Sequence, residues 1–361
     1  MLFAPGPVIT SERVKKAALA PDLCHRSSDF ENIYHSLRNG LLKLYKADIK
    51  RHTAVVVSGS GTAANEVVIP SVLKNGEKAL LISNGEFGNR LKMMIECYKI
   101  GLQLVELSWG EYPDLDKIED KLRKDKSIKL ISAVFHETST GMINPVHEIG
   151  RLARDYGKMY HVDAISAVGG EDVDVDRDNI DFCTGVPNKS VSGQPGISFV
   201  CVNRERIREI ENYQKRNIYL NLQHHIKKAE DCDQTPNTPS VIMFLTLNEA
   251  LEELFQEGLD NRIKRYKEDA IIIRKGLNDL NLELLLKEEK YMSNTITSAF
   301  LPEKIDIYKF IGRMYDEGYV VYPGKGHLLK KNMFQIANMG QIYPEDCMKF
   351  NDILRKVLAG L

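Results

Sequence analysis

Residues 158–163 read Lys-Met-Tyr-His-Val-Asp and residues 181–189 read Asp-Phe-Cys-Thr-Gly-Val-Pro-Asn-Lys, and these two segments decide the fold. Each contains a short apolar run of the kind that forms a buried strand. The first run ends at Asp163, and Lys189 follows the second. Residues that follow parallel strands gather at one edge of a sheet, where ligands bind. We therefore expect Asp163 and Lys189 to share one site.

Short apolar runs alternate with helical patterns on both sides of these segments, from residue 53 to about residue 203. The expected strands are 53–57, 78–83, 102–107, 128–135, 158–163, 180–184 and 197–202. The helices expected between the first five of them are 63–73, 87–99, 115–124 and 146–156. Such alternation favours an α/β fold with a mainly parallel seven-stranded sheet that is covered by helices on both faces.

The pattern changes near residue 205, where a polar and basic stretch and a turn-rich one lead into a second region. Helices are expected there at 241–257, 262–278, 305–316 and 345–358, with strands at 295–300 and 319–322. A chain of 361 residues exceeds the ~250–300 at which a single core stops growing. We expect an N-terminal arm at 1–15, a large cofactor-binding domain at 16–240 and a smaller C-terminal α+β domain at 241–361.

The composition excludes several classes of protein. With 49 basic and 50 acidic residues, the formal net charge of −1 gives no reason to expect nucleic acid or a membrane surface as a partner. The six cysteines have no zinc-site spacing and suit a reducing cytoplasm. The first residues have no signal-peptide pattern, and no run is long enough to span a membrane. His224 and His225 are adjacent, so we expect surface residues there and no metal site.

Asp163 and Lys189 together suit one cofactor, pyridoxal phosphate. Most lysines are solvated, but a partly desolvated lysine at a sheet edge has a lowered pKa and can form a Schiff base with an aldehyde. An aspartate after a strand can cap a helix. It can also hold a pyridine nitrogen protonated, since at ~3 Å and an effective dielectric near ~20 the attraction is about 5 kcal/mol.

Three other features can serve such a cofactor. The turn Ser-Gly-Ser-Gly-Thr at 58–62 joins a strand to a helix and can cradle a phosphate, although it is neither a dinucleotide nor a Walker motif. Phe87 is either a core aromatic of its helical stripe or a ring stacked on the cofactor. The polar residues 136–141 are either an ordinary loop or a source of hydroxyl groups near the phenolic oxygen of the cofactor.

With these residues, the chain resembles the class V aminotransferases of fold type I nearly end to end. It is most similar to the 2-aminoethylphosphonate–pyruvate transaminases and more distantly to the alanine–glyoxylate (serine–pyruvate) transaminases. The likeness rests on ordered motifs, which are Pro5-Gly6-Pro7, Gly59-Ser60-Gly61, Ser83-Asn84-Gly85, Glu137-Thr138-Ser139-Thr140-Gly141-Met142, Val162-Asp163-Ala164, Asn188-Lys189, Gly193-Gln194-Pro195-Gly196 and Tyr322-Pro323-Gly324-Lys325.

The resemblance implies a role for each residue around the ring of pyridoxal 5′-phosphate. Lys189 would form the Schiff base, and Asp163 would face the ring nitrogen. Phe87 would stack on the ring, and Thr138 would lie near its oxygen. Asn188, directly before the lysine, belongs to the same cofactor-binding set.

The resemblance also implies how the phosphate is held and how the protein assembles. Ser60, Gly61 and Thr62 would bind the phosphate of their own protomer. Asn237 and Thr238 lie in a stretch that such enzymes lend to the neighbouring subunit's phosphate. We therefore expect a homodimer with shared active sites.

The chain departs from the family pattern at the residues that bind the substrate. These transaminases usually carry an arginine where this chain has Gln335, and that arginine clamps the acidic group of the substrate. Glutamine supplies neither a charge nor a bidentate fork. Arg26, in a Cys-His-Arg stretch that matches the alanine–glyoxylate branch better, and Lys325 are the candidates to replace that cation. We expect the substrate to meet Arg26, Gln335 and Lys325.

The expected activity is transfer of an amino group from a small primary amine or amino acid, similar to 2-aminoethylphosphonate, to an oxo-acid such as pyruvate. Gln335 motivates two alternatives, a pyridoxal-phosphate lyase or decarboxylase and a non-catalytic module that keeps the fold. A transaminase of the alanine–glyoxylate type is a further alternative. A cysteine desulfurase is disfavoured, because that family usually stacks a histidine where Phe87 stands.

Overall fold

The seven expected strands form one sheet in the computed structural model, which describes all 361 residues. They are β1 (His52–Ser58), β2 (Lys78–Ser83), β3 (Gly101–Glu106), β4 (Ile128–Val134), β7 (Met159–Asp163), β8 (Phe182–Gly185) and β9 (Ile197–Asn203). Their order is β1-β9-β8-β7-β4-β2-β3, and only β9 runs antiparallel to its neighbours. The prediction of a mainly parallel seven-stranded sheet is confirmed.

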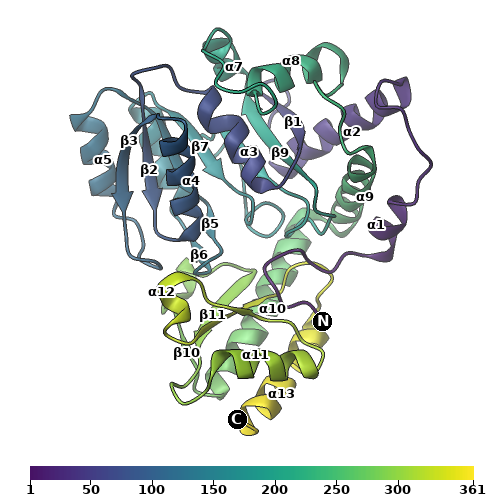
Figure 1. Ribbon diagram of the computed structural model, residues 1–361, viewed down its shortest axis with the longest axis vertical. Helices are drawn as coiled ribbons and strands as arrows, with labels where there is room; N and C mark the ends of the chain where they lie inside the picture. The colour runs from purple at the N-terminus through teal and green to yellow at the C-terminus, as the bar shows by residue number, and fades with distance from the viewer.

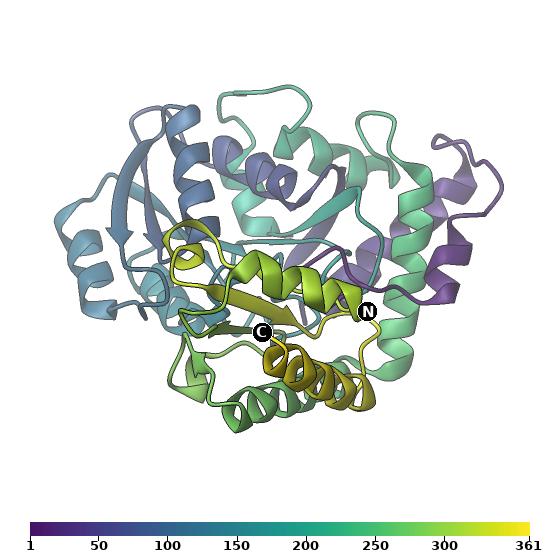
Figure 2. The same ribbon diagram turned by 60° about the horizontal axis from the view of Figure 1, so that its bottom comes forward.

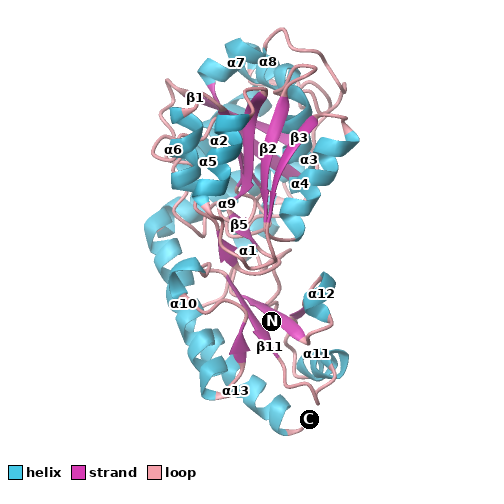
Figure 3. Cartoon of the chain, turned by 90° about the vertical axis from the view of Figure 1, so that its left-hand side faces the viewer, coloured by secondary structure: helices cyan, strands magenta, loops and turns pink.

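Helices cover both faces of this sheet, as Figure 3 shows. They include α2 (Ser28–Leu44), α3 (Gly61–Val68), α4 (Glu86–Cys97), α5 (Leu115–Lys124) and α6 (Val146–Asp155). Because both faces are buried, inner strands such as β4 and β9 are nearly continuous apolar runs without alternation, whereas the edge strand β3 is only half-buried. The helix expected at 63–73 ends at Val68 and continues as a short 3₁₀ turn, Ile69–Ser71, because Pro70 cannot donate the next helical hydrogen bond.

A second, antiparallel sheet lies in the lower part of Figure 1 and in front in Figure 2. Its order is β10-β11-β13-β12. These strands are β10 (Glu283–Leu284), β11 (Ile296–Phe300), β12 (Tyr322–Pro323) and β13 (Met333–Ala337), and the helices beside them are α10 (Leu259–Asp279), α11 (Ile307–Asp316), α12 (Gly326–Leu329) and α13 (Pro344–Ala359). The strand expected at 319–322 forms only at β12, and β13 was not predicted.

Two hydrophobic cores correspond to the two sheets, with 65 and 18 buried residues. Helix α9 (Val241–Glu257) contributes Phe244 and Leu254 to the larger core, whereas Phe3 of the N-terminal arm packs in the smaller one. The side chains of α10 join the smaller core from Ile273 onward. This packing favours a division within α10 over the one expected at residue 240, and the domain limits remain a prediction.

The polar stretch after β9 contains two helices that were not predicted, α7 (Arg204–Ile210) and α8 (Leu222–Cys232). His224 is exposed as expected, but the expectation is wrong for His225, which is buried and whose Nε2 lies 3.0 Å from the carbonyl oxygen of Tyr219. The reason is helical spacing, since Leu222, His225 and Ile226 fall on one buried face. A short helix, α1 (Glu12–Ala17), follows the N-terminal arm. None of the helices could cross a membrane.

Candidate active site

A cavity of about 210 Å³ lies between the carboxyl edge of the large sheet and the smaller sheet. It brings together Phe87, Thr138, Lys189, Lys325 and Gln335, five of the residues expected from the sequence. The other residues that line it are Pro5, Gly6, Arg90, Ser139 and Tyr322. The N-terminal arm, both domains and the loop after β8 therefore meet at one point.

Lys189 is half-buried in this cavity, and its Nζ donates a hydrogen bond to the carbonyl oxygen of Pro5. The arm can approach so closely because residue 6 is glycine. Gly6 has φ +125°, and a Cβ there would lie 3.2 Å from the Cδ and Cε atoms of Lys189. Burial and the nearby ammonium of Lys325 lower the pKa of Lys189 to about 8. More of this amine is therefore neutral, and nucleophilic, near physiological pH than in an ordinary lysine.

Asp163 ends β7 and is only 4 % exposed. Its Oδ1 accepts from the backbone N–H of Ile165 at 3.0 Å, and its Oδ2 accepts from Nδ2 of Asn65 at 2.6 Å. Asn65 in turn accepts from Oγ1 of Thr184 at 2.7 Å. Burial raises the pKa of Asp163 above the ordinary range, against the opposing effect of these donors. The carboxylate is thus held in one orientation by groups from α3 and its own strand end.

Asn65 was missed in the sequence, although a buried amide on the otherwise apolar face of α3 is an unusual residue that needs partners. We expect Asn65→Ala to lower the free energy of unfolding by about 1–3 kcal/mol, since it removes one buried hydrogen-bond partner each from Asp163 and Thr184. Urea titration measures this change. Asn212→Ala, at an exposed asparagine, is the matched control and should change the stability by under about 0.5 kcal/mol. Equal effects of the two substitutions would refute the role of Asn65.

Thr138 begins the turn of a small hairpin made by β5 (His136–Glu137) and β6 (Met142–Ile143). Its Oγ1 is buried and has no hydrogen-bond partner within the chain. The preceding residue, Glu137, is fully buried and accepts from the backbone N–H groups of Phe87 at 3.1 Å and Gly88 at 3.0 Å. Glu137, which the sequence did not single out, therefore fixes the start of α4 and with it the position of Phe87.

The glycine-rich turn lies at the N-terminus of α3, as expected. Ser60 is the N-cap residue, but its hydroxyl makes no capping bond and is exposed. The first N–H groups of a helix have no partner within it, so this end can bind an anion. A Cβ at Gly61 would lie 2.6 Å from Ile165, so only glycine lets the turn pack against the loop that follows Asp163. Arg90 contacts Thr62, with Nη1 3.5 Å from Oγ1.

Eight of the expected residues are outside the lining of this cavity: Asp163 and Asn188, the turn residues Ser60, Gly61 and Thr62, and Arg26, Asn237 and Thr238. Arg26 is exposed and donates to Oε1 of Gln234 at 2.6 Å and to the carbonyl oxygen of Thr235 at 2.9 Å. Arg26 thus lies against the segment that contains Asn237 and Thr238.

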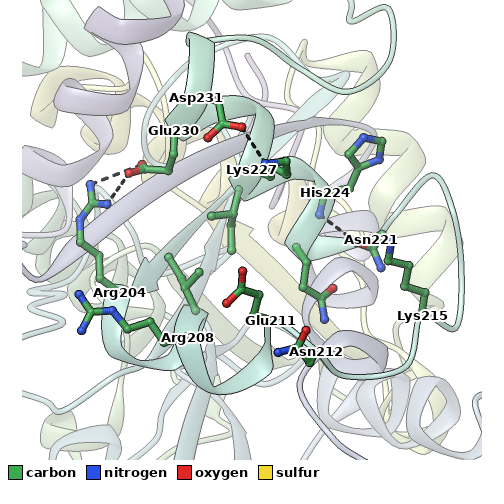
Figure 4. A pocket seen from close by; sticks show the side chains of 13 residues that line it. Arg204, Arg208, Glu211, Asn212, Lys215, Asn221, His224, Lys227, Glu230 and Asp231 are labelled. Carbon is green, nitrogen blue, oxygen red and sulfur yellow. Dashed lines mark hydrogen bonds and ion pairs between the residues drawn. The ribbon is translucent and has the colours of Figure 1, made fainter.

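A larger hollow of about 660 Å³ lies elsewhere, between α7 and α8 (Figure 4). Two ion pairs link charged residues of its lining. Arg204 pairs with Glu230, and Nζ of Lys227 lies 3.0 Å from Oδ2 of Asp231. It contains none of the residues that the sequence singled out for chemistry, apart from the exposed His224, so volume alone does not locate the site.

The residues around the smaller cavity fit pyridoxal phosphate. The partnerless Oγ1 of Thr138 is a group that the oxygen of the ring would satisfy. Lys189 offers an amine of lowered pKa, and the buried carboxylate of Asp163 lies behind it at the end of β7. The free N-terminus of α3 is suited to a phosphate.

Comparison with known proteins agrees with this geometry. The family model "Aminotransferase class-V" matches residues 12–321. An uncharacterized aminotransferase of Methanocaldococcus jannaschii is 35% identical over 341 residues, which are 94% of this chain and 88% of that protein. A 2-aminoethylphosphonate–pyruvate transaminase of Lysinibacillus sphaericus is 32% identical over 360 residues, 99% of this chain and 97% of its own length. The crystal structure of an alanine–glyoxylate aminotransferase from Nostoc sp. superimposes with a TM-score of 0.93 at 26% identity, covering 99% of this chain and 94% of the other.

Proposed function

Because this chain belongs to the class V aminotransferases, we propose that it transfers the amino group of a small primary amine, similar to 2-aminoethylphosphonate, to an oxo-acid such as pyruvate. Enzymes of this class depend on pyridoxal 5′-phosphate. The observation that carries the proposal is the pairing of a partly desolvated Lys189 in the cavity with a buried Asp163 at the neighbouring strand end. The named relatives support a phosphonate donor.

When it is bound, pyridoxal phosphate supplies an aldehyde that holds amines and a ring that accepts electrons from the carbon next to nitrogen. Lys189 would hold that aldehyde through Nζ in the resting enzyme, and once an amine substrate is bound its Nζ would carry a proton to and from the substrate carbon. Asp163 keeps a proton on the ring nitrogen through its negative charge. These two groups are the catalytic residues of the proposal.

The remaining residues bind and orient. Phe87 offers its ring as a stacking surface, and Glu137 fixes its position. Thr138 donates or accepts at the ring oxygen through its free hydroxyl. The carbonyl oxygen of Asn188 packs against the N-terminal arm, so closely that it would be 3.2 Å from a Cβ at Gly6. This contact places the lysine that follows.

We assign the phosphate to Ser60, Gly61 and Thr62, at the free N-terminus of α3. In a homodimer, Asn237 and Thr238 of the partner protomer would complete this cradle. Their position outside their own cavity, with Arg26 beside them, supports sharing of residues between protomers. Six unpaired cysteines support a reducing cytoplasm as the compartment.

A transaminase and a lyase differ in their need for an acceptor, and Gln335 keeps the lyase as the second candidate. Purified enzyme, 2-aminoethylphosphonate and pyruvate should give alanine continuously. Without pyruvate, a transaminase should release about one equivalent of oxo-product per site and stop, because the amino group stays on the enzyme. Continuous oxo-product without an acceptor would identify a lyase, and no reaction with any small amine would leave the non-catalytic alternative.

The lowered pKa of Lys189 predicts how fast the apoenzyme takes up its cofactor. Only the neutral amine attacks an aldehyde, so the rate of reconstitution should rise with pH through about 8, where the pKa of Lys189 lies. An ordinary lysine would give this rise near pH ~10.4. Lys325→Met should move the inflection to higher pH, since it removes a neighbouring positive charge. Stopped-flow absorbance measures both profiles, and an inflection at pH 10 or above in the unmodified protein would contradict the prediction.

A further inference from the structure

The lining of the cavity is basic. Lys189, Arg90 and Lys325 line it, and no carboxylate is among its ten lining residues. Neither Arg90 nor Lys325 forms an ion pair anywhere in the chain, whereas Lys92, on the same helix as Arg90, pairs with Glu106. The buried Asp163 is a nearby counter-charge for Lys189 and Arg90, so the cavity of about 210 Å³ is suited to an anion at Lys325.

Arg90 and Lys325 lie against the same aromatic ring. Cζ of Arg90 and Nζ of Lys325 are each 4.9 Å from the centre of the Phe87 ring. Arg90 belongs to α4 in the large domain, whereas Lys325 precedes α12 in the small one. Contact with an aromatic ring holds a cation only weakly, so both groups can turn to an anion, which makes stronger charge-assisted hydrogen bonds.

Gln335 cannot donate a hydrogen bond to an anion in the cavity, because both of its side-chain N–H groups already have acceptors. Nε2 donates to the carbonyl oxygen of Thr138 at 2.7 Å and to Oγ of Ser298 at 3.0 Å, and the side chain is 1 % exposed. A backbone carbonyl can only accept, which fixes the orientation of the amide. Gln335 therefore links the small sheet to the Thr138 loop and leaves only an oxygen acceptor, which repels an anion.

The phosphate of the cofactor is the other anion that these cations could meet. Its proposed cradle, Ser60, Gly61 and Thr62, lies outside the lining of the cavity, and it has the N–H groups and dipole of α3 to hold a phosphate. Arg90 reaches toward this cradle through its contact with Thr62, but Lys325 comes from the opposite domain. Lys325 is therefore left available to a second anion.

We propose that Lys325, supported by Arg90, binds the acidic group of the amino donor and takes over the task that an arginine at position 335 performs in related enzymes. The inference rests on the proposed function and names its substrate class: short primary amines that carry a phosphonate or carboxylate. Lys325 is the specificity-determining residue. Because its partner Arg90 lies in the other domain, the bound acid also joins the two domains.

Ethylphosphonate and propionate test this subsite without any reaction, because they have the acidic group and lack the amine. We expect calorimetric titration of the holoenzyme to show binding of both. Lys325→Met should weaken each by about 10- to 100-fold, the usual loss for a hydrogen bond to a charged group. Arg90→Met should also lower the affinity for both anions. The control is Lys330→Met, at an exposed lysine one turn further along the chain that has no ion pair. It should change the affinity for neither anion.

Kinetics with three donors of similar length give a second measurement. Lys325→Met should raise KM for 2-aminoethylphosphonate and β-alanine by the same factor. The KM for n-propylamine, which has no acidic group, should stay within about threefold of its original value. Lys325→Arg should recover most of the loss for the two acidic donors. The affinity of the apoenzyme for pyridoxal phosphate, followed by fluorescence at a pH above the reconstitution inflections of both proteins, should stay unchanged in Lys325→Met.

Three results would overturn the inference. The first is a holoenzyme that binds neither anion at millimolar concentration, and the second is unchanged anion affinity in Lys325→Met. The third is a loss of cofactor affinity with unchanged anion affinity, which would assign the lysine to the cofactor phosphate. Failure of the proposed function is distinct, since it would appear as intact anion binding with no alanine formed from any donor.

Discussion

Lys189→Ala should abolish turnover, lowering kcat/KM by about 10³-fold or more. A positioned acid–base group contributes roughly 10²–10⁴-fold on its own, and this residue also holds the cofactor between turnovers. Alanine formation from 2-aminoethylphosphonate and pyruvate measures the loss. A small exogenous amine such as methylamine should restore part of the rate, because it can carry the proton in place of Nζ.

The fold should survive this substitution. The Nζ of Lys189 bonds only to the carbonyl oxygen of Pro5, so its removal deletes a desolvated cation and leaves no buried carboxylate without a partner. Thermal unfolding of Lys189→Ala should therefore match that of the unmodified protein and of the control Lys330→Ala. Activity above about a tenth of the original, with the fold intact, would contradict the assigned role.

Asp163→Asn is expected to have the second-largest effect, a fall in kcat of roughly 10³-fold. The substitution keeps the shape of the side chain, but its single oxygen can accept from only one of the two donors that face the carboxylate, the N–H of Ile165 and Nδ2 of Asn65. The larger loss is the charge, which at ~3 Å and an effective dielectric near ~20 contributes about 5 kcal/mol to holding the proton on the ring nitrogen. Each 1.36 kcal/mol of lost transition-state stabilisation is about tenfold in rate.

Asp163→Glu separates the charge from the geometry in this test. It keeps the negative charge but adds a methylene group at a position that is 4 % exposed, so it should be slower than the unmodified enzyme and clearly faster than Asp163→Asn. Steady-state kinetics with saturating cofactor measure all three proteins. If Asp163→Asn stays within tenfold of the original rate, the carboxylate does not act on the ring nitrogen.

The large sheet could be predicted because most of its strands are buried on both faces and are therefore continuous apolar runs. The meeting of Lys189, Phe87 and Thr138 at its carboxyl edge, where Asp163 ends β7, followed from that fold class. Strand β13 was missed because Met333–Ala337 is short and has glutamine at its centre, so neither its length nor its alternation separates it from a loop. His225 was misplaced because the helix α8 that buries it lies in a polar stretch.

The groups that position the catalytic residues could not be predicted, because their partners are distant in the chain. Asn65 meets Asp163 across 98 residues, and Gln335 meets Thr138 across 197. The sequence shows that Gln335 lacks the usual charge, but only the structure shows that both of its N–H groups are occupied. Arg90 carried no signal in the sequence, since an arginine three residues after Phe87 is an ordinary surface residue until its neighbours are known.

Reduction of the fully loaded protein with borohydride, followed by peptide mapping with mass spectrometry, tests most directly whether Lys189 holds the cofactor. Borohydride makes the link between the lysine nitrogen and the aldehyde carbon permanent. We predict a single adduct on the peptide that contains Lys189 and none in Lys189→Ala. Lys325 lies in the same cavity and is the most demanding internal control. An adduct on Lys325 or on any other lysine, or none in protein that retains its full cofactor content, would contradict the account.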